Sequence, residues 1–180
     1  MIVHPSGMSA TASRLTVFLT FLLACALSLA CSKTDDSEKI RAVIARGAAL
    51  AEAHDIAGIL DLATGDVRAA PMDLDRRGIK GVLWRTFTYY GPLDVLYPRP
   101  AVEVEADGHT AMARFPFLIV KKGHPVPNLK RFRDDPLEWI EALGETADLY
   151  RLRLLFAKQD GAWRVKHASL ERFTGTGFAE

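Results

Sequence analysis

Cysteine is scarce in this chain, and its position excludes several kinds of site. The 180 residues include two cysteines, Cys25 and Cys31, which lie within and directly after an apolar N-terminal segment. If that segment is removed before Cys31, no other cysteine remains. The folded part then has no disulfide, no thiol nucleophile and no cysteine-based metal site. Its stability must therefore come from a hydrophobic core.

The chain also lacks an excess of charge of either sign. Lys and Arg number 23, Asp and Glu number 22, and Arg14 is the one formally charged side chain among residues 1–30. The remaining residues therefore carry equal numbers of basic and acidic side chains. Because nucleic-acid-binding proteins usually have a clear basic excess, we expect no nucleic-acid partner.

The motifs that identify common metal and catalytic sites are missing as well. The sequence has no His-x-x-x-His pair, no cluster of three carboxylates, no glycine-rich phosphate loop and no Gly-x-Ser-x-Gly nucleophile motif. Glu103 and Glu105 alternate along a predicted strand, which indicates a solvated face. We therefore expect neither a metal ion nor another cofactor.

An uninterrupted apolar run, Leu15–Ala30, follows Arg14. This run is shorter than the roughly 20 residues that a membrane-spanning helix needs. A positive flank, a short apolar core and small residues at its end are typical of a secretory signal peptide. Met8 is an alternative start that would shorten the flank. We therefore predict that residues 1–30 are cleaved and that the rest of the chain is exported.

The residues before Cys31, Leu-Ser-Leu-Ala, resemble a bacterial lipobox, and hydrophobicity ends abruptly after the cysteine. The resemblance implies that Cys31 is lipidated and that several acyl chains anchor the protein stably in a membrane. Ser32, in place of Asp, implies the outer membrane, facing the periplasm. Ser28 departs from the large aliphatic residue that a lipobox prefers. The segment Leu22–Cys25 fits that preference better but would leave an apolar stub, so Cys25 and an ordinary signal peptide remain alternatives.

Three helices are predicted in the first half of the exported part. The first carries apolar residues at helical spacing from Ile40 to Ala51. Asp55 is the expected N-cap of the second helix, and Asp73 or Asp75 that of the third. A short strand, Val67–Ala70, is expected between them. The apolar face of the third helix consists of Ile79, Val82, Leu83, Phe87 and Tyr90.

The apolar period changes from helical to twofold after residue 100. Asp107–Gly108 and Asp160–Gly161 each separate two alternating runs, which predicts two antiparallel hairpins. Residues 121–144, between the hairpins, are predicted to be an insertion, and residues 174–180 a loose tail. A run of helices followed by a run of strands indicates an α+β fold with the helices packed on one face of the sheet.

This order of elements resembles the nuclear transport factor 2-like superfamily. The segment Phe156–Val165, Phe-Ala-Lys-Gln-Asp-Gly-Ala-Trp-Arg-Val, is similar to that family's last hairpin. The resemblance covers residues 38–173, which would form a single domain after a tether at 31–37. It implies three N-terminal helices in the concave face of a curved antiparallel sheet, a cone with a pocket. It implies no single activity, because members include isomerases, dehydratases, polyketide cyclases and binding modules.

Two side chains are candidates for an acid or base inside the cone. Tyr90 ends the apolar stripe of the third helix, so its hydroxyl is expected near the cone mouth. By twofold alternation His167 shares a face with Trp163 and Val165, and it lines the pocket if that face points inward. Phe87, Tyr90, Trp163 and His167 are the predicted pocket lining. The structural alternatives are a core tyrosine with a satisfied hydroxyl and a surface histidine.

Other polar residues are better explained by structure than by chemistry. Asp61 and Asp66, near the end of the second helix, indicate solvated or capping groups. His54 is expected at a helix junction and His109 just after a hairpin turn. The basic stretch from Lys121 to Arg133 is expected to be a solvated loop, with contact to anionic lipid headgroups as the alternative.

These observations favour a non-catalytic envelope lipoprotein whose cone binds a small apolar ligand or a protein partner. One alternative is a small lyase or isomerase that uses Tyr90 or His167 as acid or base. Another is a structural homodimer. Ionisable side chains converging in an enclosed apolar pocket would favour the enzyme. A filled cone would favour an interaction or structural role, and an empty apolar cone would favour ligand carriage.

Overall fold

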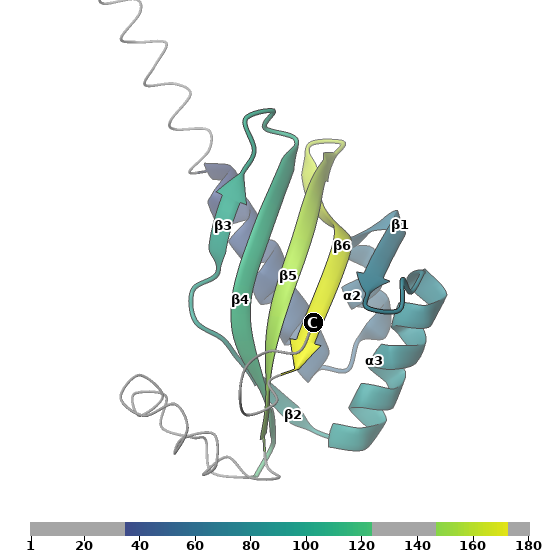
Figure 1. Ribbon diagram of the computed structural model, residues 1–180. Coiled ribbons are helices and arrows are strands. Elements are labelled where there is room, and N and C mark those ends of the chain that lie inside the picture. Colours follow the sequence, from purple (N-terminus) through teal and green to yellow (C-terminus); the bar gives the residue numbers. More distant parts are fainter. Residues whose placement is uncertain (1–34, 124–146, 173–180) are drawn as a thin grey trace, which may run out of the picture. The chain divides into compact units, whose positions relative to one another are not determined.

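The computed structural model describes residues 35–123 and 147–172 (Figure 1). From Ser37 onward, the described residues belong to one compact unit. In the described ranges, no helix is long and apolar enough to cross a membrane. The elements are, in chain order, a first helix (residues 35–52), α2 (Ile56–Asp61), β1 (Ala63–Ala70), α3 (Arg76–Tyr90), β2 (Leu93–Leu96), β3 (Ala101–Val104), β4 (Thr110–Lys121), β5 (Ala147–Gln159) and β6 (Ala162–Arg172).

The strands form one curved sheet in the order β1-β6-β5-β4-β2, with β3 also paired to β4 (Figure 1). The helices precede the main hairpins, and the predicted α+β class with N-terminal helices against the concave face is confirmed. One pairing differs from the expected antiparallel pattern, because β1 runs parallel to β6. The predicted strand Val67–Ala70 is also longer than expected. It begins at Ala63, which pairs with Val165.

Helices α2 and α3 begin, and α3 ends, at the residue types that the sequence indicated. Asp55 and Asp75 each accept a hydrogen bond from the backbone N–H three residues on, at 2.9 and 2.8 Å. Of the two caps left open for α3, Asp75 is therefore the one used. Asp73 lies in the preceding turn and pairs with Arg68 at 2.9 Å. At the other end, Gly91 takes a φ of 62°, a conformation that glycine adopts without steric cost.

Two apolar clusters hold the helices against the sheet. In the first, Ile40 and Ile44 of the first helix are almost fully buried and pack on the inner face of the sheet. The sheet residues in that cluster are Ala111, Ala113, Phe115, Leu154, Phe156 and Trp163. The second cluster lies under α3 and contains Phe87, Tyr90, Leu93 and Ile119. Burial of these side chains is the main driving force for the arrangement.

The hairpin predictions are confirmed, and two local predictions are wrong. Asp160 and Gly161 take φ values of 51° and 78°, as a two-residue turn between β5 and β6 requires. Thr64–Asp66, expected to end the second helix, lies inside β1. Strand β2 was not predicted, because four residues are too few to show a period. Most of the predicted insertion 121–144 and all of the predicted tail lie outside the described residues.

An extra residue in β6 changes which side chains face the helices. Val165 pairs with Phe156, but His167 pairs with Leu155, so Lys166 has no partner in this ladder. Such a bulge shifts the alternation of faces by one residue. Val165 therefore shares the inner face with Phe156, whereas His167 shares the outer face with Leu155. The prediction that His167 and Val165 share a face is wrong for this reason.

Candidate functional site

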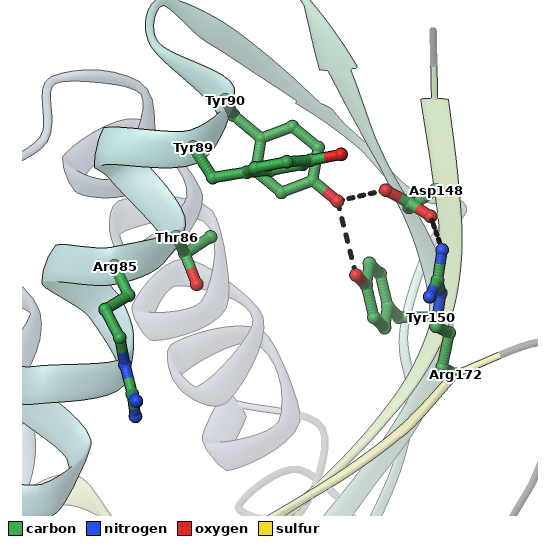
Figure 2. A pocket seen from close by; sticks show the side chains of 7 residues that line it. All are labelled: Arg85, Thr86, Tyr89, Tyr90, Asp148, Tyr150 and Arg172. Carbon is green, nitrogen blue, oxygen red and sulfur yellow. Dashed lines mark hydrogen bonds and ion pairs between the residues drawn. The ribbon is translucent and has the colours of Figure 1, made fainter. Parts of the chain in front are cut away.

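A cavity of about 300 Å³ lies where the C-terminal end of α3 meets the ends of β5 and β6 (Figure 2). Its lining is mainly polar, with three tyrosines and two arginines. Tyr89 is 70% exposed, so this side of the cavity is open to solvent. The lining residues are Arg85, Thr86, Tyr89 and Tyr90 from α3, Asp148 and Tyr150 from β5, and Arg172 from β6. We call this cavity the α3–β5 pocket.

The centre of the pocket is a hydrogen bond between a buried tyrosine and a carboxylate. Tyr90 is the last residue of α3, and only 9% of its surface is exposed. Its hydroxyl donates to Asp148 Oδ2, as Figure 2 shows. A helix end and a strand from the other half of the chain are thus joined by side chains.

Tyr150 extends this contact into a chain of hydroxyl groups. Its oxygen lies 3.3 Å from that of Tyr90. A tyrosine hydroxyl carries one proton, and that of Tyr90 is directed to Asp148. Either hydroxyl can be the donor in this contact. When Tyr90 gives its proton to Asp148, Tyr150 donates to Tyr90, and the lone pairs of the Tyr150 oxygen can then accept from a ligand. The ring of Tyr150 stacks on Phe117, with centroids 5.5 Å apart.

Arg172 completes the site from β6. Its Nη2 atom lies 2.6 Å from Asp148 Oδ1. The arginine side chain is 66% exposed and that of Asp148 21%, so the ion pair lies at the edge of the pocket. The hydrogen bond to Asp148 raises the pKa of Arg172, which stays charged. Both oxygens of Asp148 thus have partners.

The protonation state of Tyr90 follows from its surroundings. Burial raises the pKa of its hydroxyl, and the hydrogen bonds to Asp148 and Tyr150 raise it further. Near neutral pH the group is therefore a neutral hydrogen-bond donor. It is suited to hold a carboxylate or a ligand oxygen in place, as a proton donor does in preorganised polar sites.

Of the four predicted pocket residues, Tyr90 lines the pocket and His167 lies on the outer face of the sheet. Phe87 and Trp163 are core residues at 8% and 4% exposure. Phe87 stacks on His54, with ring centroids 4.7 Å apart. A chemical role for Tyr90 stays a prediction.

The remaining polar candidates also have structural surroundings. Asp61 pairs with Arg76 at 3.1 Å. Asp107 accepts from the backbone N–H groups of His109 and Thr110 in the hairpin turn, and these bonds lower its pKa. No group of three or more potential metal ligands occurs among the residues that the structure describes.

Sequence reasoning predicted one of the seven lining residues, Tyr90, and missed the other six. Three of these six, Asp148, Tyr150 and Arg172, form the hydrogen-bond network with Tyr90. Asp148 and Tyr150 are two apart on β5, so one face of that strand carries both. This spacing was a usable signal, since Leu152 and Leu154 continue the same face. Arg172 gave no such signal, because its position depends on the bulge in β6.

No protein-family model and no curated protein matches this chain. Solved structures do match. One is a nuclear transport factor 2-like protein with a cystatin-like fold from Novosphingobium aromaticivorans, with a TM-score of 0.57 and 22% identity. The match covers 85% of this chain and 89% of that one. This chain has the nuclear transport factor 2-like fold. The fold predicted from the order of elements is thereby confirmed.

Two further matching structures have provisional enzyme names. One, named provisionally as a scytalone dehydratase, has a TM-score of 0.60 and 12% identity, and the match covers 81% of this chain and 89% of that one. The other, named provisionally as an aromatic ring hydroxylase, has a TM-score of 0.57 and 15% identity over 78% of this chain and 91% of that one. Both come from Novosphingobium aromaticivorans. At these identities the likeness concerns the fold alone.

Proposed function

We propose that this protein is an exported, lipid-anchored envelope protein whose α3–β5 pocket binds a small oxygen-bearing ligand. The observation that carries the proposal is the convergence of Tyr90, Asp148, Tyr150 and Arg172 on one cavity. These groups form a fixed network rather than an apolar lining. A small number of placed polar groups beside aromatic rings is typical of ligand pockets.

The polar lining favours a different ligand from the wholly apolar one expected from the sequence. The Tyr150 oxygen can accept a hydrogen bond from a ligand. The exposed guanidinium of Arg85 makes no ion pair or hydrogen bond within the described part of the chain. Three tyrosine rings supply flat apolar surface. A volume of about 300 Å³ fits a compound of one or two rings. We therefore propose a small ring compound with hydroxyl, carbonyl or carboxylate groups.

Binding is favoured over catalysis by the state of Asp148. A general base must reach the substrate proton with a free oxygen. Asp148 Oδ2 accepts from Tyr90, and Oδ1 accepts from Arg172. The carboxylate therefore holds Tyr90 and Arg172 in place in this structure, and a substrate proton could reach only its remaining lone pairs.

A small lyase or isomerase is the second candidate. Four ionisable side chains converge here, and such convergence is a feature of acid–base sites. In that case Asp148 would take a proton from the substrate, and the hydroxyls of Tyr150 and Tyr90 would stabilise a developing oxyanion. The provisional name of one matching structure, a scytalone dehydratase, is compatible with this candidate, because a dehydratase is a lyase.

One experiment separates the two candidates. Hydroxylated and carboxylated aromatic compounds are screened by thermal shift against wild type, Asp148→Asn and Tyr150→Phe. Tyr97→Phe is the control, because Tyr97 packs against Phe115 of the first apolar cluster and does not line the pocket. Binding that both pocket variants lose and the control keeps, without a change in compound mass, supports ligand binding. Turnover in wild type that Asp148→Asn removes would instead establish the enzyme. Shifts that are equal in all variants would show that the pocket is not the binding site.

The anchor is tested separately. Intact mass is measured after expression with the native N-terminus, for wild type and for Cys31→Ala. A triacylated chain that begins at residue 31, absent in the variant, supports lipid anchoring through Cys31. Equal unlipidated masses would exclude anchoring through Cys31 and leave Cys25 or an ordinary signal peptide. Sedimentation velocity of the same samples tests the homodimer alternative.

A further inference from the structure

One side of α3 exposes cations and large aromatic rings together. Counted from Arg77, the exposed cations and rings follow at three, seven, eight and twelve positions, which places them along one side of the helix. Trp84 is 62% and Tyr89 70% exposed. Lys121, at the end of β4, adds its ammonium group 5.0 Å from the ring centre of Tyr89. We call this the α3 surface; it consists of Arg77, Lys80, Trp84, Arg85, Tyr89 and Lys121.

The charge of the α3 surface is not neutralised by the described part of the protein. Helix α3 contains no acidic residue. Within residues 35–123 and 147–172, the side chains of Arg77, Lys80 and Arg85 make no ion pair. Arg76, on the neighbouring side of the helix, is paired with Asp61. The surface therefore presents a local positive charge although the chain as a whole is nearly neutral.

Aromatic rings among cations are suited to one kind of partner. Trp and Tyr concentrate at the interface between lipid headgroups and acyl chains, because each ring has an apolar body and a polar edge. Helices that lie in that interface combine such rings with Lys and Arg. Exposed Trp84 between Lys80 and Arg85 reproduces this combination.

We propose that the α3 surface binds the anionic headgroup region of a phospholipid bilayer. Arg77, Lys80, Arg85 and Lys121 contact the headgroups, and Trp84 enters the interface. Arg85 and Tyr89 also line the α3–β5 pocket, so docking places the mouth of the pocket beside the headgroups. The proposal rests on the charges and exposures of α3. It requires neither the ligand nor the lipid anchor proposed above.

Quenching of Trp84 fluorescence tests the proposal. The full chain with its native N-terminus is mixed with vesicles of brominated phosphatidylcholine, with or without phosphatidylglycerol. The quenching due to Trp84 is the difference between wild type and Trp84→Phe. We expect this quenching in vesicles that contain phosphatidylglycerol, and we expect it to be weak in neutral vesicles and at high salt. Because the signal reports the depth of Trp84, it measures docking whether or not the chain carries an anchor.

Charge reversal identifies the residues responsible. Arg77→Glu with Lys80→Glu should lower the ratio of docked to undocked protein at least about 30-fold. The matched control, Arg114→Glu with Lys166→Glu on the sheet, makes the same change in net charge and should retain most of the quenching. Both double variants are checked for wild-type circular dichroism.

Three results would overturn the proposal. The first is equal quenching of Trp84 in neutral and anionic vesicles. The second is an equal loss of this quenching in the two double variants. In the third, the α3 variant changes the sedimentation coefficient of the protein without lipid. The surface would then be an interface between copies of the chain.

Discussion

Tyr150 on β5 lies directly opposite Arg172 on β6, and a single extra residue produces this pairing. Counted back from the turn, where Gln159 pairs with Ala162, an unbroken ladder would place Glu171 opposite Tyr150. The unpaired Lys166 shifts the register by one. Arg172 therefore reaches the pocket, and Glu171 lies on the outer face.

The bulge also determines the surroundings of two charged groups. On the outer face Glu171 is 5% exposed and pairs with Arg151 at 3.3 Å and Arg153 at 3.1 Å. On the inner face the guanidinium of Arg172 pairs with Asp148. An unbroken ladder would exchange the two faces and leave each charge without its partner.

Deletion of Lys166, by contrast, is expected to leave the pairing of both halves of β6 unchanged. His167 would follow Val165 directly and both would keep their present partners, so Glu171 and Arg172 would keep theirs as well. The free energy of unfolding in urea should then change by less than the roughly 3 kcal/mol that an unpaired buried charge costs. Lys166→Ala, which keeps the residue count, is the control and should stay within about 0.5 kcal/mol of wild type. A deletion variant that loses about 3 kcal/mol or more would show that the partners of Glu171 and Arg172 depend on the bulge.

The bulge also explains which features of the fold and the pocket could be predicted from the sequence and which could not. Turn residues and alternation correctly predicted the hairpin Tyr150–Val165, because Asp160–Gly161 has one favoured geometry. When the alternation is continued past Lys166, it assigns His167 to the wrong face and gives no indication that Arg172 reaches the pocket. No local signal marks a bulge at a lysine, and beyond it the pair Ala168 and Leu154 packs against the core. Tyr90 could be placed at the pocket because a helix period continues unbroken to the residue before Gly91–Pro92.

The choice between two possible caps for α3 gives a second prediction. Asp75→Ala removes the hydrogen bond to the backbone N–H of Gly78 and should lower the free energy of unfolding by about 1 kcal/mol. Asp73→Asn removes an exposed ion pair to Arg68 and should cost less than about 0.5 kcal/mol. Urea titrations of both variants measure the difference. Equal losses would contradict the assignment of Asp75 as the cap.

Removal of one hydroxyl tests the energetic role of the pocket network. Tyr90→Phe leaves Asp148 Oδ2 without its donor, and a hydrogen bond to a charged group contributes about 2 kcal/mol. Chemical denaturation should show a loss of that size. Tyr89→Phe is the matched control, because the neighbouring ring is exposed and its change should stay within about 0.5 kcal/mol. A Tyr90 variant as stable as the control would mean that the contact adds nothing to folding.

Stability at alkaline pH should depend on Tyr90. In the unfolded chain this hydroxyl loses its proton near pH ~10, whereas burial and the bond to Asp148 raise its pKa in the folded protein. Above pH ~10 the unfolded state therefore binds fewer protons than the folded state, and stability falls as pH rises. Below that pH the contribution is fully present.

The comparison with Tyr90→Phe isolates this effect, because all other titrating groups are shared. The urea midpoint of wild type should fall more steeply between pH ~9 and ~11 than that of the variant. Tyr89→Phe is the matched control, because it removes one exposed hydroxyl from the neighbouring ring. Tyrosinate absorption gives an independent measurement, because wild type and Tyr90→Phe should gain equal absorbance while folded. Parallel midpoint curves, or a greater gain in wild type, would show that Tyr90 ionises in the folded protein at its ordinary pH.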